Sequence, residues 1–279
     1  MSSSLLDMFS LKGQTAIVTG CTRGIGEQMA VALAEAGARL IFVQVSTLPI
    51  KKRLKLTPTQ RNLDSHPVHK LVEALGHKTL IVTADLSSKT DTAKLIKDIT
   101  SIEEVHPTIL LNCAGIQRRH AAEEFPDADW DEVIQVNLSS VFTLARDFGK
   151  YLLSRDADET GHRGTIINIA SLMTFQGGLN IPAYAAAKGG VAQLTKSLSN
   201  EWAGKGIQVN AIAPGYVQTD LTSDLMRDTD RAGTILARIP AGRWGKPEDF
   251  KGVVVFLASK ASRYVSGEIV TVDGGWMGR

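Results

Sequence analysis

Residues 14–37 read QTAIVTGCTRGIGEQMAVALAEAG, and this stretch decides the fold class of the chain. Its first six residues are a short strand with an apolar centre, and the Ala-rich part after the glycines has the spacing of an amphipathic helix. Gly20, Gly24 and Gly26 stand between the two, where they permit a tight turn and a close approach to a pyrophosphate at the helix N-terminus. The stretch is therefore expected to open a nucleotide-binding βαβ unit.

The rest of the chain continues this pattern in a single domain. Its 279 residues are 43% hydrophobic, which suits one large core. Further strands are expected at 39–44, 79–84, 108–113, 166–170, 208–213 and 268–272. We predict an α/β fold in which residues 1–279 form a single Rossmann-type doubly wound domain. Its seven-stranded parallel sheet would carry helices on both faces.

The composition argues against several classes of function. A net charge of +2 and a pI near 8.5 are too mild and too dispersed for nucleic-acid binding. No apolar stretch reaches 18 residues and no secretory signal begins the chain, so we expect a soluble cytoplasmic protein with no membrane partner. Cys21 and Cys113 are expected to be free thiols. The sequence has no HxxxH and no CxxC, so no metal site is predicted.

A second stretch, residues 166–194 (IINIASLMTFQGGLNIPAYAAAKGGVAQL), carries the candidate chemistry. It reads as a buried strand, a loop and a helix, and Tyr184 and Lys188 are one helical turn apart on one face. Ser171 closes the strand, so the loop can bring its hydroxyl beside the phenol. A phenol with a pKa of about 10 is a poor base at neutral pH, and a nearby ammonium lowers that pKa.

The alternative for this stretch is a core tyrosine and a surface lysine, which is the commoner meaning of a bare YxxxK. The glycine spacing G-x-x-x-G-x-G is also weak evidence alone, because glycine turns occur for packing. Together with Ser171, the two patterns favour a catalytic set in which Ser171 holds the substrate oxygen and Tyr184 moves its proton.

These motifs make the chain similar to short-chain dehydrogenases/reductases over nearly its whole length. The motifs are Thr19 to Gly26 (TGCTRGIG), Asn112 to Gly115 (NCAG), Asn137, the Ser171/Tyr184/Lys188 set, and Pro214-Gly215 with Thr219. The resemblance implies hydride transfer between a nicotinamide cofactor and a secondary alcohol or ketone.

The resemblance also implies a role for each catalytic residue. Tyr184 would act as base, Ser171 would position the hydroxyl, and Lys188 would lower the pKa of Tyr184 and bind the nicotinamide ribose. Asn137 would bend a long helix expected at 129–155 and hold a water that links Lys188 to solvent. The alternative for Asn137 is a simple capped kink.

The resemblance further assigns the cofactor contacts. They are Gly20, Thr22, Arg23, Gly24, Ile25, Gly26, Gln44, Asp85, Leu86, Asn112, Ala114, Gly115, Tyr184, Lys188, Pro214, Gly215, Val217 and Thr219. The family usually has NNAG where this chain has NCAG, so Cys113 is a departure, interpreted as a packing residue beside the nicotinamide.

The choice between NAD and NADP depends on Gln44. Dinucleotide folds usually place a carboxylate at the end of the second strand, where it binds the ribose 2′-hydroxyl. Gln44 rejects a 2′-phosphate less strongly, and the basic residues between 51 and 61 could attract one, although a solvated basic loop is equally consistent. The cofactor is NAD or NADP, and the resemblance favours NAD.

The substrate implied by the resemblance is a sugar acid. Arg118 and Arg119 follow the NCAG turn, and a guanidinium matches a carboxylate bidentately. We expect one of them, with Ser171 and Tyr184, to bind the substrate, although both could be solvated or lie at a subunit contact. The polar segment 215–245 would be the substrate lid. Two alternatives are a reductase for another carbonyl, of gluconate 5-dehydrogenase or 3-oxoacyl reductase type, and a nucleotide-binding regulator without turnover.

The resemblance also implies a homotetramer with 222 symmetry, paired through its long helices and its C-terminal strand. The small residues of 184–190 and the end Gly274-Gly275-Trp276-Met277 could form those contacts or could equally be core. The predicted partners are thus a small-molecule substrate and further copies of this chain.

Residues 45–60, VSTLPIKKRLKLTPTQ, are an atypical insertion between the second strand and a helix expected near Pro67. Connections in α/β units usually run about 2 to 6 residues, and removing these sixteen would join Gln44 directly to Arg61. The permitted codons match a 5′ splice site, a branch point and a 3′ splice site. A translated in-frame intron, which would imply a fungal source, and a genuine family insertion both remain open.

Overall fold

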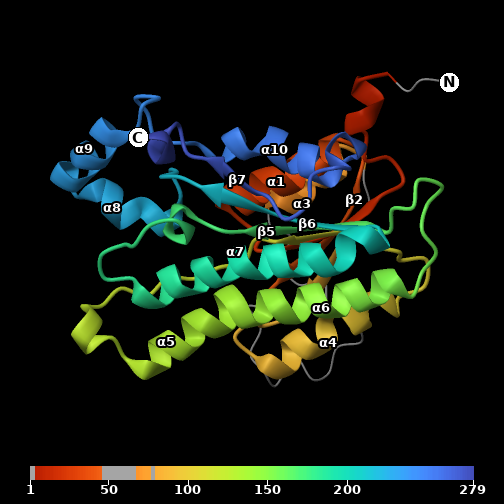
Figure 1. The fold of residues 1–279 in the computed structure, drawn as a ribbon, viewed down its shortest axis with the longest axis horizontal. Coiled ribbons are helices and arrows are strands. Elements are labelled where there is room, and N and C mark those ends of the chain that lie inside the picture. Colours follow the sequence, from red (N-terminus) through yellow and green to blue (C-terminus); the bar gives the residue numbers. More distant parts are fainter. Residues whose placement is uncertain (1–3, 46–66, 77–78) are drawn as a thin grey trace.

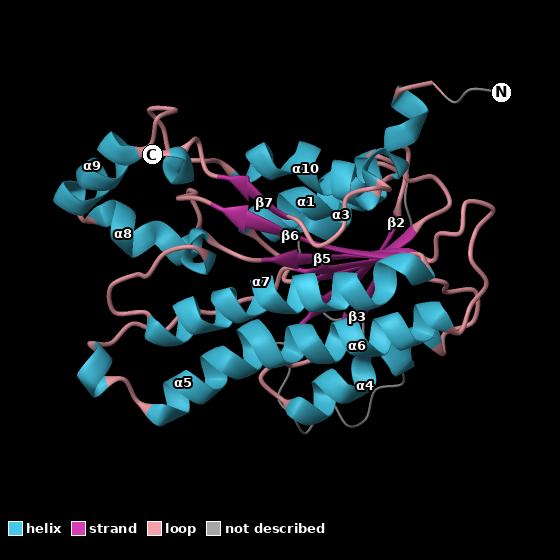
Figure 2. Ribbon diagram, viewed as in Figure 1, coloured by secondary structure: helices cyan, strands magenta, loops and turns pink. Residues whose placement is uncertain are grey.

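Seven parallel strands form one sheet in the order β3-β2-β1-β4-β5-β6-β7. Figure 2 shows this sheet between layers of helices. The computed structural model describes residues 4–45, 67–76 and 79–279. The strands are β1 (Thr15–Thr19), β2 (Arg39–Gln44), β3 (Thr79–Thr83), β4 (Ile109–Asn112), β5 (Gly164–Ile169), β6 (Ile207–Pro214) and β7 (Ile269–Val272). The predicted fold class is confirmed, and each strand lies within two residues of its predicted range.

Helices cover both faces of the sheet (Figure 1). One face carries α1 (Gly24–Glu35), α3 (Pro67–Ala74) and α10 (Lys251–Ala258). The other carries α4 (Lys89–Thr100), α5 (Asp127–Ile134), α6 (Ser140–Leu153) and α7 (Pro182–Trp202). Two short helices, α8 (Ser223–Arg227) and α9 (Thr229–Arg238), lie beyond one end of the sheet. All strands point the same way, so their carboxyl ends share one edge of the sheet.

The apolar runs of the sequence fill the two interfaces between sheet and helices. Both β5 and β6 are buried at every position, as expected for central parallel strands. The helix α4, for which the sequence analysis made no prediction, is signalled by its cap: the Ser88 hydroxyl accepts a hydrogen bond from the Asp91 amide. Leu95, Ile96 and Ile99 then form its buried stripe.

The helix expected at 129–155 is interrupted in the middle. A π-helical turn over Gln135–Ser139 separates α5 from α6, and it carries the fully buried Asn137. π-Helical turns inside helices are rare and often mark functional positions. The π-helical turn lies at the position where the bend was expected, and the bend itself stays a prediction.

The connection between β2 and β3 contains the helix α3 and the predicted insertion 45–60. The helix α3 begins at Pro67, as predicted. Of the predicted insertion 45–60, all but Val45 lies outside the described residues, so its origin stays a prediction. In the part of the chain that the structure describes, no helix is long and apolar enough to cross a membrane.

Candidate active site

A cavity of about 1360 Å³ opens at the carboxyl edge of the sheet, where the strand order reverses between β1 and β4. Ligands of open α/β folds bind at this switch point. Residues from the glycine turn, from the ends of β2 to β6, and from α7, α8 and α9 line the cavity. The wall includes every predicted cofactor and substrate residue except Asn112, whereas Asn137 lies behind it.

The glycine turn is packed too tightly to accept side chains. A Cβ on Gly20, whose φ is +66°, would lie 2.6 Å from the Ala114 Cα, and one on Gly26 would lie 2.1 Å from the Gly20 carbonyl oxygen. The Thr19 hydroxyl accepts hydrogen bonds of 3.1 Å from the amides of Cys113 and Ala114, which fixes the NCAG turn against the glycine turn.

The start of α1 fits a dinucleotide pyrophosphate. No side chain caps this helix, because its N-cap residue, Arg23, makes no capping hydrogen bond. The first amides of α1 thus remain free to bind an anion at the positive end of the helix dipole. Gln44, at the end of β2, also lines the cavity, and its buried Oε1 has no hydrogen-bond partner among the described residues. These residues fit a nicotinamide dinucleotide.

Ser171, Tyr184 and Lys188 converge on one point of the cavity wall. Ser171 precedes a short 3₁₀ turn, and its Oγ accepts a 3.2 Å hydrogen bond from the Met173 amide. The Ser171 hydroxyl lies close enough to the Tyr184 phenol to lower its pKa. Lys188 follows one turn later on α7, with its Nζ 5.6 Å from the centre of the Tyr184 ring. That Nζ donates a 2.6 Å hydrogen bond to the Ile169 carbonyl.

The net pKa shift of Tyr184 is upward, and its expected lowering by Lys188 stays a prediction. Burial raises the pKa of Tyr184 above its usual value of 10, and this effect outweighs the hydrogen bond from Ser171, which lowers it. Burial also lowers the pKa of Lys188 to about 8. At neutral pH the phenol is therefore protonated and the ammonium is charged.

Asn137 supports the set from behind the wall. Its Oδ1 accepts a 2.9 Å hydrogen bond from the Ile116 amide, and its Nδ2 donates a 2.7 Å hydrogen bond to the Ile116 carbonyl. A Cβ on the neighbouring Gly115 would lie 3.1 Å from Asn137 Oδ1 and 4.0 Å from Lys188 Nζ. The π-helical turn thereby holds the chain after β4 beside the lysine.

Asn112, the last residue of β4, lies outside the cavity wall, whereas Cys113, which follows it, is part of that wall. Asn112 is buried, and its Nδ2 donates a 3.0 Å hydrogen bond to Asn168 on β5. The side chain of Asn112 therefore links two neighbouring strands. Asn112 was predicted to contact the cofactor directly, but it does not line the cavity. Burial raises the pKa of Cys113 to about 12, so its thiol is neutral. A Cβ on Gly26 would lie 3.1 Å from the Cys113 sulfur, which supports its interpretation as a packing residue.

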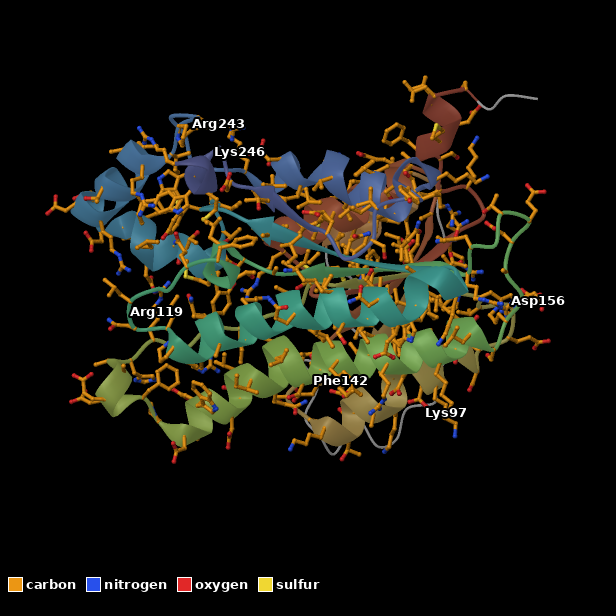
Figure 3. All side chains as sticks on the ribbon, viewed as in Figure 1. Lys97, Arg119, Phe142, Asp156, Arg243 and Lys246 are labelled. Carbon is orange, nitrogen blue, oxygen red and sulfur yellow. The ribbon has the colours of Figure 1, made fainter. Side chains whose placement is uncertain are left out.

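The two candidate anchors for a carboxylate have different surroundings. Arg118 forms ion pairs with Glu132 at 2.7 Å and Asp129 at 3.8 Å, so its charge is already compensated. Arg119 donates a 2.8 Å hydrogen bond to Gln117 and has no carboxylate within ion-pairing distance among the residues the structure describes. In Figure 3 Arg119 lies at the end of the molecule that carries α8 and α9. Of the two, Arg119 is free to bind an acid.

Several wall residues were not predicted from the sequence. Arg231, Thr234, Ile235 and Arg238 are spaced i, i+3, i+4 and i+7 on α9, and all four line the cavity. This spacing is a sequence signal, but it shows only that the residues share one face. Trp276, considered a possible subunit contact, is 3% exposed and belongs to the wall instead.

The described residues contain no group of three or more His, Cys, Asp and Glu side chains that could hold a metal ion. The arrangement can perform proton transfer at a half-buried phenol, next to a cleft that fits a dinucleotide. It also presents an uncompensated guanidinium at the cavity mouth. Such a site is suited to oxidoreduction of a hydroxyl or carbonyl carbon.

Comparison with known proteins agrees with this geometry. A family model described as enoyl-(acyl carrier protein) reductase matches residues 20–277. The chain is 48% identical over 275 residues to the 2-dehydro-3-deoxy-D-gluconate 5-dehydrogenase of Pseudoalteromonas atlantica, covering 99% of this chain and 100% of the relative. The name of this relative agrees with a resemblance in the sequence itself. Phrases such as AGIQRRH, NIASLMTFQGG and RIPAGRWG resemble 2-deoxy-D-gluconate 3-dehydrogenase, which is also called 2-dehydro-3-deoxy-D-gluconate 5-dehydrogenase.

Solved structures give the same result. A protein of Agrobacterium tumefaciens, described as a 2-deoxy-D-gluconate 3-dehydrogenase with bound NADP, is 42% identical with a TM-score of 0.83, covering 98% of this chain and 100% of that one. A gluconate 5-dehydrogenase of Burkholderia cenocepacia, in complex with NADP and tartrate, is 34% identical with a TM-score of 0.85, covering 99% and 100%. The Ser171/Tyr184/Lys188 site, the fold and these matches together show that the chain belongs to the short-chain dehydrogenase/reductase family.

Proposed function

We propose that this chain transfers hydride between a nicotinamide cofactor and a secondary alcohol or ketone carbon of a sugar acid. The leading substrates are 2-dehydro-3-deoxy-D-gluconate and 2-deoxy-D-gluconate. The observation that carries the proposal is that Ser171, Tyr184 and Lys188 share one cavity with an uncompensated arginine, Arg119. The names of relatives at 43–48% identity over 99% of the chain support the sugar acid.

Each catalytic residue has a distinct task in this mechanism. The cofactor, when bound, supplies the hydride chemistry. Ser171 donates a hydrogen bond to the substrate oxygen, which Tyr184 deprotonates during oxidation or protonates during reduction. Lys188 stabilises the phenolate electrostatically while it is charged. Asn137 holds the chain after β4 in place, and we retain its proposed role in a water-linked proton relay.

The protonation states give the reaction a pH preference. A protonated Tyr184 is ready to donate a proton, which favours carbonyl reduction at neutral pH. Oxidation of the alcohol needs the phenolate, and burial raises the pKa of Tyr184. The oxidation rate should therefore increase from pH 7 toward alkaline pH. Reduction should show the opposite trend.

For the cofactor we propose that NADP is accepted, in place of the preference for NAD that the family resemblance favoured. Solved relatives hold NADP. Gln44 brings no negative charge to the end of β2, so it does not repel a 2′-phosphate. The Arg23 side chain is 77% exposed, lines the same cavity and pairs with Asp220 at 3.0 Å. Calorimetric Kd values for NADP and NAD test this, and Arg23→Met should weaken NADP more than NAD.

We also propose that the chain assembles as a homotetramer in the cytoplasm. Trp130 on α5 and Phe142 and Leu153 on α6 are 40%, 43% and 38% exposed, and apolar side chains of this size often mark an interface. Phe142 points outward from α6 in Figure 3. Light scattering that shows a monomer at micromolar concentration would count against the assembly. Cell fractionation tests the location.

Two proposals concern segments of the domain. Residues 215–245 would form the substrate lid, which is consistent with the cavity-lining face of α9. Residues 45–60 would be a retained intron or a genuine insertion. Sequencing the spliced transcript separates these two origins, because a message that keeps the sixteen codons refutes the intron.

A spectrophotometric assay of nicotinamide reduction tests the function directly. The purified protein is supplied with NADP or NAD and with 2-deoxy-D-gluconate, 2-dehydro-3-deoxy-D-gluconate, D-gluconate or the matching neutral alditol. We expect turnover with the deoxygenated acids and little with the alditol. A 3-oxoacyl thioester is assayed in the reductive direction. Cofactor binding without turnover of any substrate would instead indicate a nucleotide-binding regulator.

A further inference from the structure

The face of α9 that meets the cavity combines an apolar anchor with two cations. Ile235 is 7% exposed and belongs to a buried cluster with Leu172, Trp244 and Trp276, so it fixes the rotation of the helix. Arg231 and Arg238 lie one turn before it and about one turn after it, and both line the cavity. The lid helix therefore presents guanidinium groups to whatever the cavity holds.

The two arginines of α9 are not equivalent. The guanidinium carbon of Arg238 lies 3.9 Å above the centre of the Trp276 ring. That ring is held in turn, because its Nε1 donates a 3.0 Å hydrogen bond to Gln176 and its centre lies 4.7 Å from the Tyr216 ring. Arg238 is thus part of a stacked wall. Arg231 has no side-chain hydrogen bond or ion pair among the described residues, so its charge remains available.

Arg119 lines the same cavity, on the loop that follows β4. Partial burial lowers its pKa, and the positive charge of Arg231 lowers it further, so the two guanidiniums repel each other. The charge of Arg231 also acts on the Tyr216 phenol, as does that of Arg119. Asp224 on α8 is the acidic group that acts on Arg119, and it is already paired with Arg227 at 2.9 Å.

We propose that the carboxylate of the substrate binds between Arg119 and Arg231 and bridges the loop after β4 to the lid helix α9. One anion turns the repulsion between these two arginines into two charge-assisted contacts. This arrangement makes the lid specific for acids that carry the carboxylate away from the reacting carbon. The inference rests on the proposed function, and it assigns Arg231 as a specificity residue of that site.

Replacing either arginine should therefore weaken the binding of acidic substrates and leave the binding of neutral ones unchanged. Arg231→Met and Arg119→Met should each raise KM for the sugar acid by about tenfold or more, with little change for the neutral alditol. The double variant should be little worse than each single variant, because one carboxylate serves both groups. Arg231→Lys keeps the charge without the planar fork, so it should recover part of the loss.

The control is Arg243→Met. Arg243 is also an exposed arginine of the lid segment, but it pairs with Asp249 at 2.7 Å and does not line the cavity. Its loss should leave KM for the acid unchanged. Cofactor Kd and the far-UV circular dichroism spectrum of every variant should match those of the wild type.

A binding measurement separates this inference from the proposed function. Calorimetric titration of the NADP-bound protein with tartrate, a hydroxylated dicarboxylate, needs no turnover. Tartrate binding that is lost in Arg231→Met and kept in Arg243→Met supports the bridge even if no sugar acid is turned over. Sugar-acid turnover with unchanged tartrate Kd and unchanged KM in Arg231→Met would overturn the bridge and leave the proposed function standing. Equal losses for acid and alditol would overturn it as well.

Discussion

The replacement Asn137→Leu would show how strongly the π-helical turn holds the active-site wall. Asn137 is fully buried, and its amide makes hydrogen bonds of 2.9 and 2.7 Å with the amide and carbonyl of Ile116. Leucine has a similar volume and can make neither bond. The part-buried Ile116 amide and carbonyl would then lose these partners.

The magnitude follows from those two unpaired groups. A buried polar group that loses its partner costs about 1–3 kcal/mol. Asn137→Leu should therefore lower the free energy of unfolding by about 2–6 kcal/mol. It should also lower kcat, because Ile116 and Gly115 line the cavity.

Asn137→Asp gives a matched variant whose effect depends on pH. A protonated carboxyl can replace both contacts, whereas a carboxylate would face the Ile116 carbonyl oxygen and repel it. The folded state should thus raise the pKa of this carboxyl. The free energy of unfolding of Asn137→Asp should then be close to that of the wild type at acid pH. It should fall below the wild-type value as the pH rises through that raised pKa.

Urea unfolding, followed by circular dichroism at one fixed protein concentration, measures both variants against wild type. An Asn137→Leu protein within about 1 kcal/mol of wild type would refute the reasoning, since that is less than one unpaired group costs. An Asn137→Asp protein whose difference from wild type is the same at pH 5 and pH 8 would also refute it.

Tyr184→Phe should lower kcat by about 10²- to 10⁴-fold and leave cofactor Kd nearly unchanged, because the phenol is needed only for proton transfer; a wild-type kcat would show the mechanism to be wrong. The pKa of Cys113 is raised to about 12 in the folded protein, which favours the neutral thiol there. The free energy of unfolding should therefore keep its full value below about pH 9 and decrease as the pH rises toward about 12. Cys113→Ala should then reduce the alkaline slope of the free energy of unfolding by up to about 1.4 kcal/mol per pH unit, and an unchanged slope contradicts this. Gly26→Ala should abolish cofactor binding, since its Cβ would lie 2.1 Å from a carbonyl oxygen. Gly233→Ala, with no atom within 4 Å of its Cβ, is the control and should stabilise α9 by about 0.5–1 kcal/mol; equal cofactor Kd in both glycine variants would contradict the tight fit.

Local sequence patterns were sufficient for most of the fold. The apolar runs that became β1 to β7 and the glycine turn before α1 are short-range signals, because strand and turn preferences depend on neighbouring residues. The spacing of Tyr184 and Lys188 likewise placed both on one helix face before any tertiary contact was known. The candidate site could be predicted to that extent because its residues cluster at strand ends in any parallel α/β sheet.

The sequence by itself determined the fold class, the position of the dinucleotide cleft and the residues of the proposed proton-transfer set. Only the tertiary structure distinguished Arg118 from Arg119, because the distinction depends on Glu132, which a different helix brings to within 2.7 Å. The direction of the Tyr184 pKa shift also needed the structure, since burial is a property of the packed molecule and here outweighs the hydrogen bond from Ser171. The convergence of Arg231 on the site of Arg119 is of the same kind: 112 positions separate them along the chain, and only the packing of α9 against the cavity brings both into its wall.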